Sequence, residues 1–168
     1  MPARADVVFD AFHYHHWRRH WDSLVRATRV QGGAPCPFVG AVTENAGAGM
    51  MRLLSMKTRF VSFDRPRVAA AAMVGRAFPF RRWAASMQHR ANGPDRSWLI
   101  YTYTLEVGPP ALRWLLEPPV AWVFGWQTRR RFARLRVFLE QHAADIEQWQ
   151  SEGRASVAPD HITVTTGE

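Results

Sequence analysis

The sequence is poor in cysteine, in lysine and in long apolar runs. Cys36 is the only cysteine, so the chain can form neither an intrachain disulfide nor a thiolate metal cluster. Only Lys57 among the 22 basic residues is a lysine, a skew that is weak evidence for function. The longest strongly apolar run, 118–126, is too short to span a bilayer, and residues 1–12 lack the apolar core of a secretory signal. We therefore expect a cytoplasmic protein.

Sequence motifs for catalysis are missing as well. The chain has no G-x-S-x-G elbow, no S-x-x-K, no phosphate-binding glycine loop and no carboxylate pair at short spacing. Evidence for an enzyme is therefore thin, and we expect no cofactor.

Four histidines lie close together near the N-terminus: His13, His15, His16 and His20. The last two have the i, i+4 spacing of a helical zinc site. A glutamate beside them, as in H-E-x-x-H, is absent, so a polar, partly exposed surface is the simpler interpretation and no metal is expected.

Positive charge is what the chain has in excess. The formal net charge is +8 and the sequence pI is about 11.1. Five arginines crowd into 129–136, but such a run usually marks a solvated helix face, so we expect no nucleic-acid binding. Trp114, Trp122 and Trp126 precede these arginines, and indole with guanidinium suits lipid headgroups. Transient contact with a membrane surface is one expectation; the alternative is that the tryptophans pack against the sheet or line a cavity mouth.

One long helix is predicted over 119–149. Its apolar residues recur at three- and four-residue steps: Phe124, Phe132, Leu135, Leu139, Ala143, Ile146 and Trp149. Prolines 118 and 119 suit its first turn, after a separate short turn or helix at 111–116. Such a helix is roughly 45 Å long, so a sheet would cover only part of its apolar face. Similar spacing predicts two short helices near the N-terminus, at 6–12 and 15–24.

Six segments between these helices are candidate strands, of which the first has an ambiguous pattern, so a sheet of five or six antiparallel strands is predicted. They are 25–31, 38–45, 51–63, 67–74, 84–91 and 97–107. The third is too long for a flat strand without a bulge, and the small residues 69–72 of the fourth leave room beside them. The last alternates most clearly, with Leu99, Tyr101, Tyr103 and Leu105 on the face that we take as inward. These elements predict an α+β domain over 1–150, with a sheet wrapped around a helix, and a flexible tail over 151–168.

Several segments together resemble a known superfamily. They are Val8-Phe9-Asp10-Ala11-Phe12, Trp17, Trp21-Asp22, Val61-Ser62-Phe63-Asp64-Arg65-Pro66-Arg67, Phe80-Arg81-Arg82-Trp83 and Arg129-Arg130-Arg131-Phe132-Ala133-Arg134-Leu135. Their order and spacing over 6–149 resemble bacterial polyketide cyclase/dehydrase-type members of the START-related helix-grip (SRPBCC) superfamily. The resemblance implies a curved antiparallel sheet gripping the C-terminal helix, with a hydrophobic cavity between them for lipids, polyketides or other apolar molecules. It does not imply one reaction.

The chain departs from that superfamily at its N-terminus. Members usually begin with a strand that pairs with the last strand of the sheet, and only five residues precede Asp6 here. Residues 161–166 alternate and are rich in β-branched side chains, so one hypothesis is that they form a strand on the vacant edge. A disordered tail and a start codon assigned too late are the alternatives.

The function expected from these features is the binding of a hydrophobic small molecule (a lipid, a polyketide or an aromatic compound) by a carrier or sensor. The expected cavity residues are Met87, His89, Leu99, Tyr101, Tyr103, Leu105 and Phe124. Tyr101, Tyr103 and His89 would supply the few polar contacts. A cyclase or dehydratase that uses the same three groups as acid or base is the competing class, and a protein whose own side chains fill the cavity is a third. His89 as a satisfied core histidine is the simpler structural interpretation, and the oligomeric state is not predicted.

Overall fold

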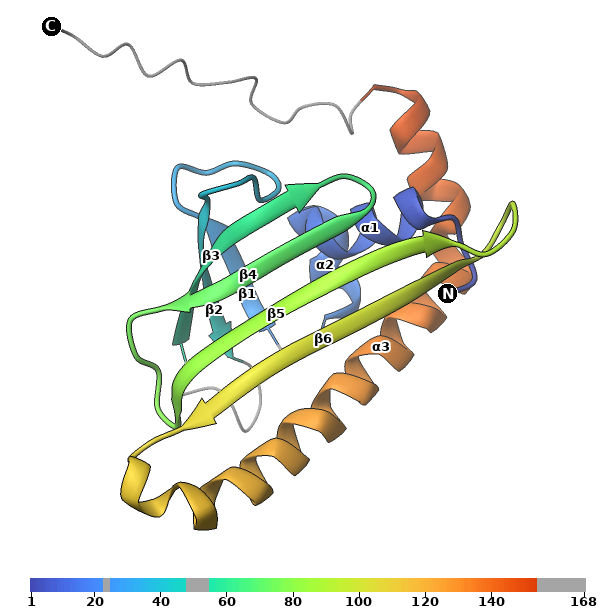
Figure 1. Ribbon diagram of the computed structural model, residues 1–168. Coiled ribbons are helices and arrows are strands. Elements are labelled where there is room, and N and C mark those ends of the chain that lie inside the picture. The colour runs from blue at the N-terminus through green and yellow to red at the C-terminus, as the bar shows by residue number, and fades with distance from the viewer. Residues whose placement is uncertain (23–24, 48–54, 154–168) are drawn as a thin grey trace, which may run out of the picture.

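The computed structural model describes residues 1–22, 25–47 and 55–153. The helices and strands, in chain order, are α1 (Ala5–His13), α2 (His15–Trp21), β1 (Val25–Val30), β2 (Val42–Gly47), β3 (Ser55–Asp64), β4 (Val68–Val74), β5 (Phe80–Ala91), β6 (Ser97–Val107), the 3-10 helix η2 (Pro110–Leu112) and α3 (Arg113–Ser151). Two short helices, an antiparallel sheet and a long closing helix confirm the predicted α+β helix-grip architecture (Figure 1).

The six strands follow one another across a single sheet, each antiparallel to the next. The register shifts between Phe60 and Ser62 on β3 and between Phe80 and Arg82 on β5. Such bulges bend a strand and increase its twist, which lets the sheet curve around the helix (Figure 1). The bulge predicted for the third strand segment is therefore confirmed, although residues 51–54 of that segment lie outside the described residues.

Helix α3 begins earlier than the sequence indicated. It starts at Arg113, so the predicted separate turn at 111–116 and the restart at residue 119 are wrong, and Pro118 and Pro119 lie inside the helix. A proline has no N–H, so the carbonyls of Trp114 and Leu115 lose their usual helical donors. Both of these residues are exposed, so water can solvate the two carbonyls. No helix within the described ranges is long and apolar enough to cross a membrane.

The packed core lies at one end of the molecule, where α1 is held between the sheet and the C-terminal half of α3. Val7 and Val8 of α1 and Leu135, Leu139 and Ile146 of α3 are fully buried there. The other half of α3 differs, because no side chain from 113 to 134 is fully buried. The helix therefore has a packed half and a loosely covered half.

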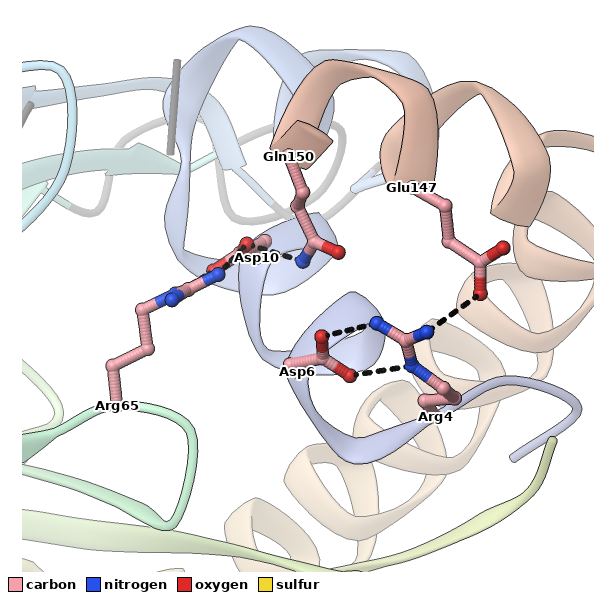
Figure 2. A network of polar contacts seen from close by, with 6 residues as sticks. All are labelled: Arg4, Asp6, Asp10, Arg65, Glu147 and Gln150. Carbon is pink, nitrogen blue, oxygen red and sulfur yellow. Dashed lines mark hydrogen bonds and ion pairs between the residues drawn. The ribbon is translucent and has the colours of Figure 1, made fainter. Parts of the chain in front are cut away.

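A buried carboxylate ties three distant segments together at the packed end (Figure 2). Asp10 of α1 accepts two hydrogen bonds from the guanidinium of Arg65, which lies in the β3–β4 turn, at 2.7 and 2.6 Å. The amide of Gln150, near the end of α3, donates to the same carboxylate at 2.6 Å. Because the Asp10 carboxylate is fully buried, this network fixes α1 between the sheet and the closing helix.

The N-terminus is tied to the last strand. The Met1 ammonium group donates to the Ser97 carbonyl at 2.6 Å, and the Ser97 amide donates to the Met1 carbonyl at 3.2 Å. Within the described ranges, β5 is the one strand that pairs with β6. The hypothesis that residues 161–166 occupy the other edge of β6 concerns residues outside the described ranges, and it stays a prediction.

Candidate functional site

The inward side chains of four strands form matching rows across the sheet. One row consists of Phe60, Ala71, Ala85 and Tyr103, which are register partners from β3 to β6. We call it the central row. Its two middle members are alanines, and its two outer members, Phe60 and Tyr103, carry aromatic rings. The inward surface of the sheet therefore forms a shallow depression at the alanines, with an aromatic ring on either side.

Helix α3 passes close over the β6 side of the central row. The ring of Phe124 lies 4.7 Å from that of Tyr103 and 6.0 Å from that of Phe80, measured between centroids. A Cβ atom at Gly125 would lie 3.5 Å from the Tyr103 hydroxyl oxygen, an ordinary van der Waals contact. The glycine therefore lets the Tyr103 hydroxyl lie close to the helix, because even a methyl group here would be in contact with it.

Burial divides the concave face of the sheet into a closed end and an open part. In the row next to the central row, Ala69 and Met87 are buried beneath α1 and the packed half of α3. All four members of the central row are only half-buried, as are Trp83 and Leu105 beyond it. The loosely covered half of α3 thus does not close against the sheet here. This open part is the candidate binding site.

Polar groups without partners border the open part. The indole N–H of Trp83 is buried and has no acceptor in the described residues. The Tyr101 and Tyr103 hydroxyls have no hydrogen-bond partner there either. Burial raises the pKa of Tyr101, although the charges of Arg131 and Arg18 oppose the shift, so its hydroxyl stays protonated at neutral pH. The site thus offers hydrogen-bond donors beside apolar surface, an arrangement suited to an oxygen atom on an otherwise apolar molecule.

His89 lies at the closed end. It is 4% exposed, and its ring centroid is 5.1 Å from that of Phe9 and 6.2 Å from that of His13. Neither ring nitrogen has a hydrogen-bond partner in the described residues, so the satisfied core histidine is not what the structure contains. Burial lowers the pKa of His89 to about 4, which keeps the ring neutral at pH 7.

The predicted cavity residues are therefore divided between the two regions. Tyr103, Leu105 and Phe124 lie at the open part, and Tyr101 lies at the boundary, 5.3 Å from the ring of Phe132. The other three belong to the closed end: Met87, His89 and Leu99. The register places His89 opposite Leu99, one inward row from Tyr101 and two from Tyr103.

Sequence reasoning missed the central alanines, Phe60 and Trp83 as part of the site. The alanine run had indicated spare room, but not where this room lies. The bulge at Val61 turns both Phe60 and Phe63 inward although they are three residues apart, which a strict alternation forbids. Only the register across the sheet brings these residues into rows.

The remaining sequence candidates have clear locations. Trp114, Trp122 and Trp126 are 76%, 72% and 44% exposed, so they do not pack against the sheet. His13 is buried, with Nδ1 2.9 Å from the Phe9 carbonyl oxygen. Within 1–22, 25–47 and 55–153, no three histidine, cysteine or acidic side chains form a group that could hold a metal ion.

Arg131 corrects the interpretation of 129–136 as a wholly solvated face. Its side chain is 12% exposed and forms an ion pair with the buried Asp22, whereas Arg129, Arg130 and Arg134 are exposed. The sequence did not indicate a partner for Arg131, because Asp22 lies 109 residues earlier, at the end of α2.

Known proteins resemble this chain in structure rather than in sequence. No protein-family model matches the sequence, and no curated protein matches it. The protein XoxI from Bacillus cereus superimposes with a TM-score of 0.63 at 13% identity, covering 83% of this chain and 90% of that one. A START superfamily protein from Mycobacterium smegmatis gives 0.61 at 13% identity, covering 88% and 92%. Norcoclaurine synthase from Thalictrum flavum, in complex with a transition-state analogue, gives 0.53 at 16% identity, covering 83% and 89%. The chain has the helix-grip fold of the START-related (SRPBCC) superfamily.

Proposed function

We propose that the protein binds a hydrophobic small molecule between the central row and the loosely covered half of α3, as a carrier or sensor. The observation that carries the proposal is the incomplete burial of inward-facing apolar side chains, Phe60, Ala71 and Ala85 among them, in a protein whose other end is closely packed. Covering such surface with an apolar ligand is favourable by about 25 cal/mol per Å².

Hydrogen-bond donors without a partner at this site indicate which chemical class of ligand fits it. Trp83 and Tyr103 lie in this part of the sheet and have no acceptor among the described residues, so a ligand with a carbonyl, ether or hydroxyl oxygen could accept a hydrogen bond from one of them. A buried donor without a partner costs about 1–3 kcal/mol, and the ligand offsets that cost when it accepts the bond. An oxygenated apolar molecule, such as a polyketide or a fatty acyl compound, therefore fits better than a pure hydrocarbon.

An enzyme of the cyclase or dehydratase type is the alternative. Its support is the fold that the chain shares with norcoclaurine synthase. The properties of the candidate acid–base groups argue against this alternative. The Tyr101 hydroxyl is protonated, so it cannot act as a base, and the His89 ring lies at the closed end against Phe9 and His13. Binding is therefore the better-supported function.

Matched substitutions at two neighbouring alanines test the proposal. Ala85→Leu fills the central row, whereas Ala84→Leu adds the same volume on the opposite face of β5. With the neutral fluorescent probe N-phenyl-1-naphthylamine, we expect wild type and A84L to bind and A85L to bind about tenfold more weakly or not at all. Equal binding by A85L and A84L would contradict the site, and a cavity filled by its own side chains predicts no binding by any of the three.

Native mass spectrometry of the protein purified from its own host tests the ligand class. We expect an apolar molecule to copurify with wild type and to be lost from A85L. If no such molecule copurifies and no compound in a panel of lipids and polyketides binds, the proposal that the protein carries an apolar ligand would be contradicted. Turnover of a panel compound by wild type would instead favour the enzyme.

A further inference from the structure

The outward face of α3 carries large apolar side chains that no described element covers. Leu115, Trp122, Trp126 and Val137 are all exposed, and steps of seven, four and eleven residues bring them to one side of the helix. We call them the outer stripe. Exposed apolar residues are ordinary when they are scattered singly, but several large ones along one side of a helix favour an interaction surface.

Two more exposed aromatic side chains lie near the beginning of α3, outside the outer stripe. Trp114 lies in the first turn of the helix. Phe78, which is 74% exposed, lies in the β4–β5 connection. The Gly108 amide donates to the Pro79 carbonyl at 3.0 Å, which holds that connection next to the segment that leads into α3. Exposed aromatic rings therefore also occur at this end of the molecule.

The charges around the outer stripe have one sign. From 113 to 137 the helix has six arginines and a single carboxylate, Glu117, which pairs with Arg113. Arg129, Arg130 and Arg134 are exposed and have no ion-pair partner in the part of the chain that the structure describes. The guanidinium of Arg130 lies over the Trp126 ring, 5.6 Å from its centroid. An anionic partner would therefore meet both apolar rings and unpaired positive charge.

We propose that the outer stripe docks on the surface of an anionic lipid bilayer. Trp122 and Trp126 lie at the level of the headgroups, where indole rings are favoured, and the exposed arginines bind lipid phosphates. A second copy of the chain fits this face less well, because its own arginines would meet those of the first. The inference goes beyond ligand binding and does not depend on it.

Vesicle cosedimentation tests the apolar part of this surface. Wild type should bind vesicles of phosphatidylglycerol and phosphatidylcholine, and bind about tenfold more weakly to phosphatidylcholine alone or at about 0.5 M NaCl. The double variant Trp122→Ser and Trp126→Ser should lose about tenfold or more of the affinity. Trp98→Ser is the control, because Trp98 is 60% exposed at the far end of β6. It should bind as wild type does.

A charge-matched pair of variants tests the arginines. Arg129→Gln with Arg130→Gln should weaken binding about tenfold or more. Arg59→Gln with Arg96→Gln lowers the net charge equally, on β3 and in the β5–β6 turn rather than on α3, and should change binding little. Equal loss in both pairs, or no binding of wild type to anionic vesicles, would overturn the proposal. Light scattering that finds a dimer broken by the Trp122 and Trp126 substitutions would overturn it in favour of a second copy.

Discussion

His89 shows at the scale of one residue what burial does to a titratable group. Its ring lies among Phe9 and His13 at the closed end of the sheet, and burial lowers its pKa to about 4. The ordinary value is 6.5. As pH falls from 6.5 towards 4, the unfolded chain therefore gains a proton that the folded chain does not bind, and the free energy of unfolding decreases. The free energy of unfolding is therefore not reduced by His89 above pH 6.5 and falls progressively below it.

Replacing His89 with phenylalanine should remove this acid sensitivity. From these two pKa values, His89 costs wild type roughly 2 kcal/mol between about pH 7.5 and about pH 5, a loss that H89F lacks. The substitution also removes two unpartnered ring nitrogens, so its stability at pH 7.5 should at least equal that of wild type. Guanidinium unfolding at both pH values measures the difference. The exposed His20, changed to phenylalanine, should leave the acid sensitivity unchanged, and an H89F protein as acid-sensitive as wild type would refute the account.

At the scale of elements, Asp22 joins α2 to α3. It follows the last residue of α2, and its carboxylate accepts a hydrogen bond from Arg18 Nε at 2.8 Å and one from Arg131 Nη2 at 2.5 Å. Both guanidiniums also lie over the ring of Phe12, at 5.1 and 4.6 Å. Burial by itself would raise the pKa of Asp22, but the charges of Arg131 and Arg18 outweigh it, so the pKa lies below its ordinary value.

Asp22→Asn should therefore be strongly destabilising at neutral pH. It leaves two mostly buried guanidiniums without their shared carboxylate, at a cost of about 3–5 kcal/mol. The charged carboxylate stabilises the fold above its unfolded pKa, near 3.8, and this contribution is lost as pH falls through the lower folded pKa, so the difference from wild type should shrink there. Urea unfolding of both proteins from neutral pH to below pH 3.8 measures this difference in the free energy of unfolding. Asp145→Asn, which removes an exposed partner of His142, should cost less than about 1 kcal/mol; equal losses in the two variants would contradict the role of Asp22.

At the scale of the whole molecule, the Asp10 network joins α1, the β3–β4 turn and the last turn of α3. Figure 2 shows it beside a second cluster, in which Arg4 pairs with Asp6 and Glu147. Each cluster contains a carboxylate of α1, but the clusters differ in burial: the Asp10 carboxylate is fully buried, whereas the Arg4 side chain is exposed. The first should therefore contribute far more to stability than the second.

Asp10→Asn and Asp6→Asn form a matched pair for this comparison. D10N removes the charge that Arg65 and Gln150 share, so it should lower the free energy of unfolding by about 3–5 kcal/mol. D6N removes a surface partner of Arg4 and should cost about 1 kcal/mol or less. Calorimetry of both variants gives the melting temperatures. Similar melting temperatures for D10N and D6N would show that the buried network does not hold the chain together as we infer.

The sequence by itself determined most of the elements and their order. Alternation in Ser97–Val107 predicted which face of β6 points inward, and the three- and four-residue steps of Leu135, Leu139 and Ile146 predicted the packed stripe of α3. Periodicity can do this because it is a local property: the spacing of apolar side chains fixes which of them share a face. The order of these segments then indicated the helix-grip fold.

Only the tertiary structure decided what lies over each face. It placed His89 under α1 and Tyr103 under the loosely covered half of α3, although both belong to the concave face of the sheet. It turned Arg131 towards Asp22 and left Trp122 exposed, although both stand on the same helix. Spacing along one element says nothing about how far a second element extends across it. The burial of the inward side chains, the pKa of His89 and the open part of the sheet all depend on how far α1 and α3 cover the sheet. The candidate site could therefore be identified only from the tertiary structure.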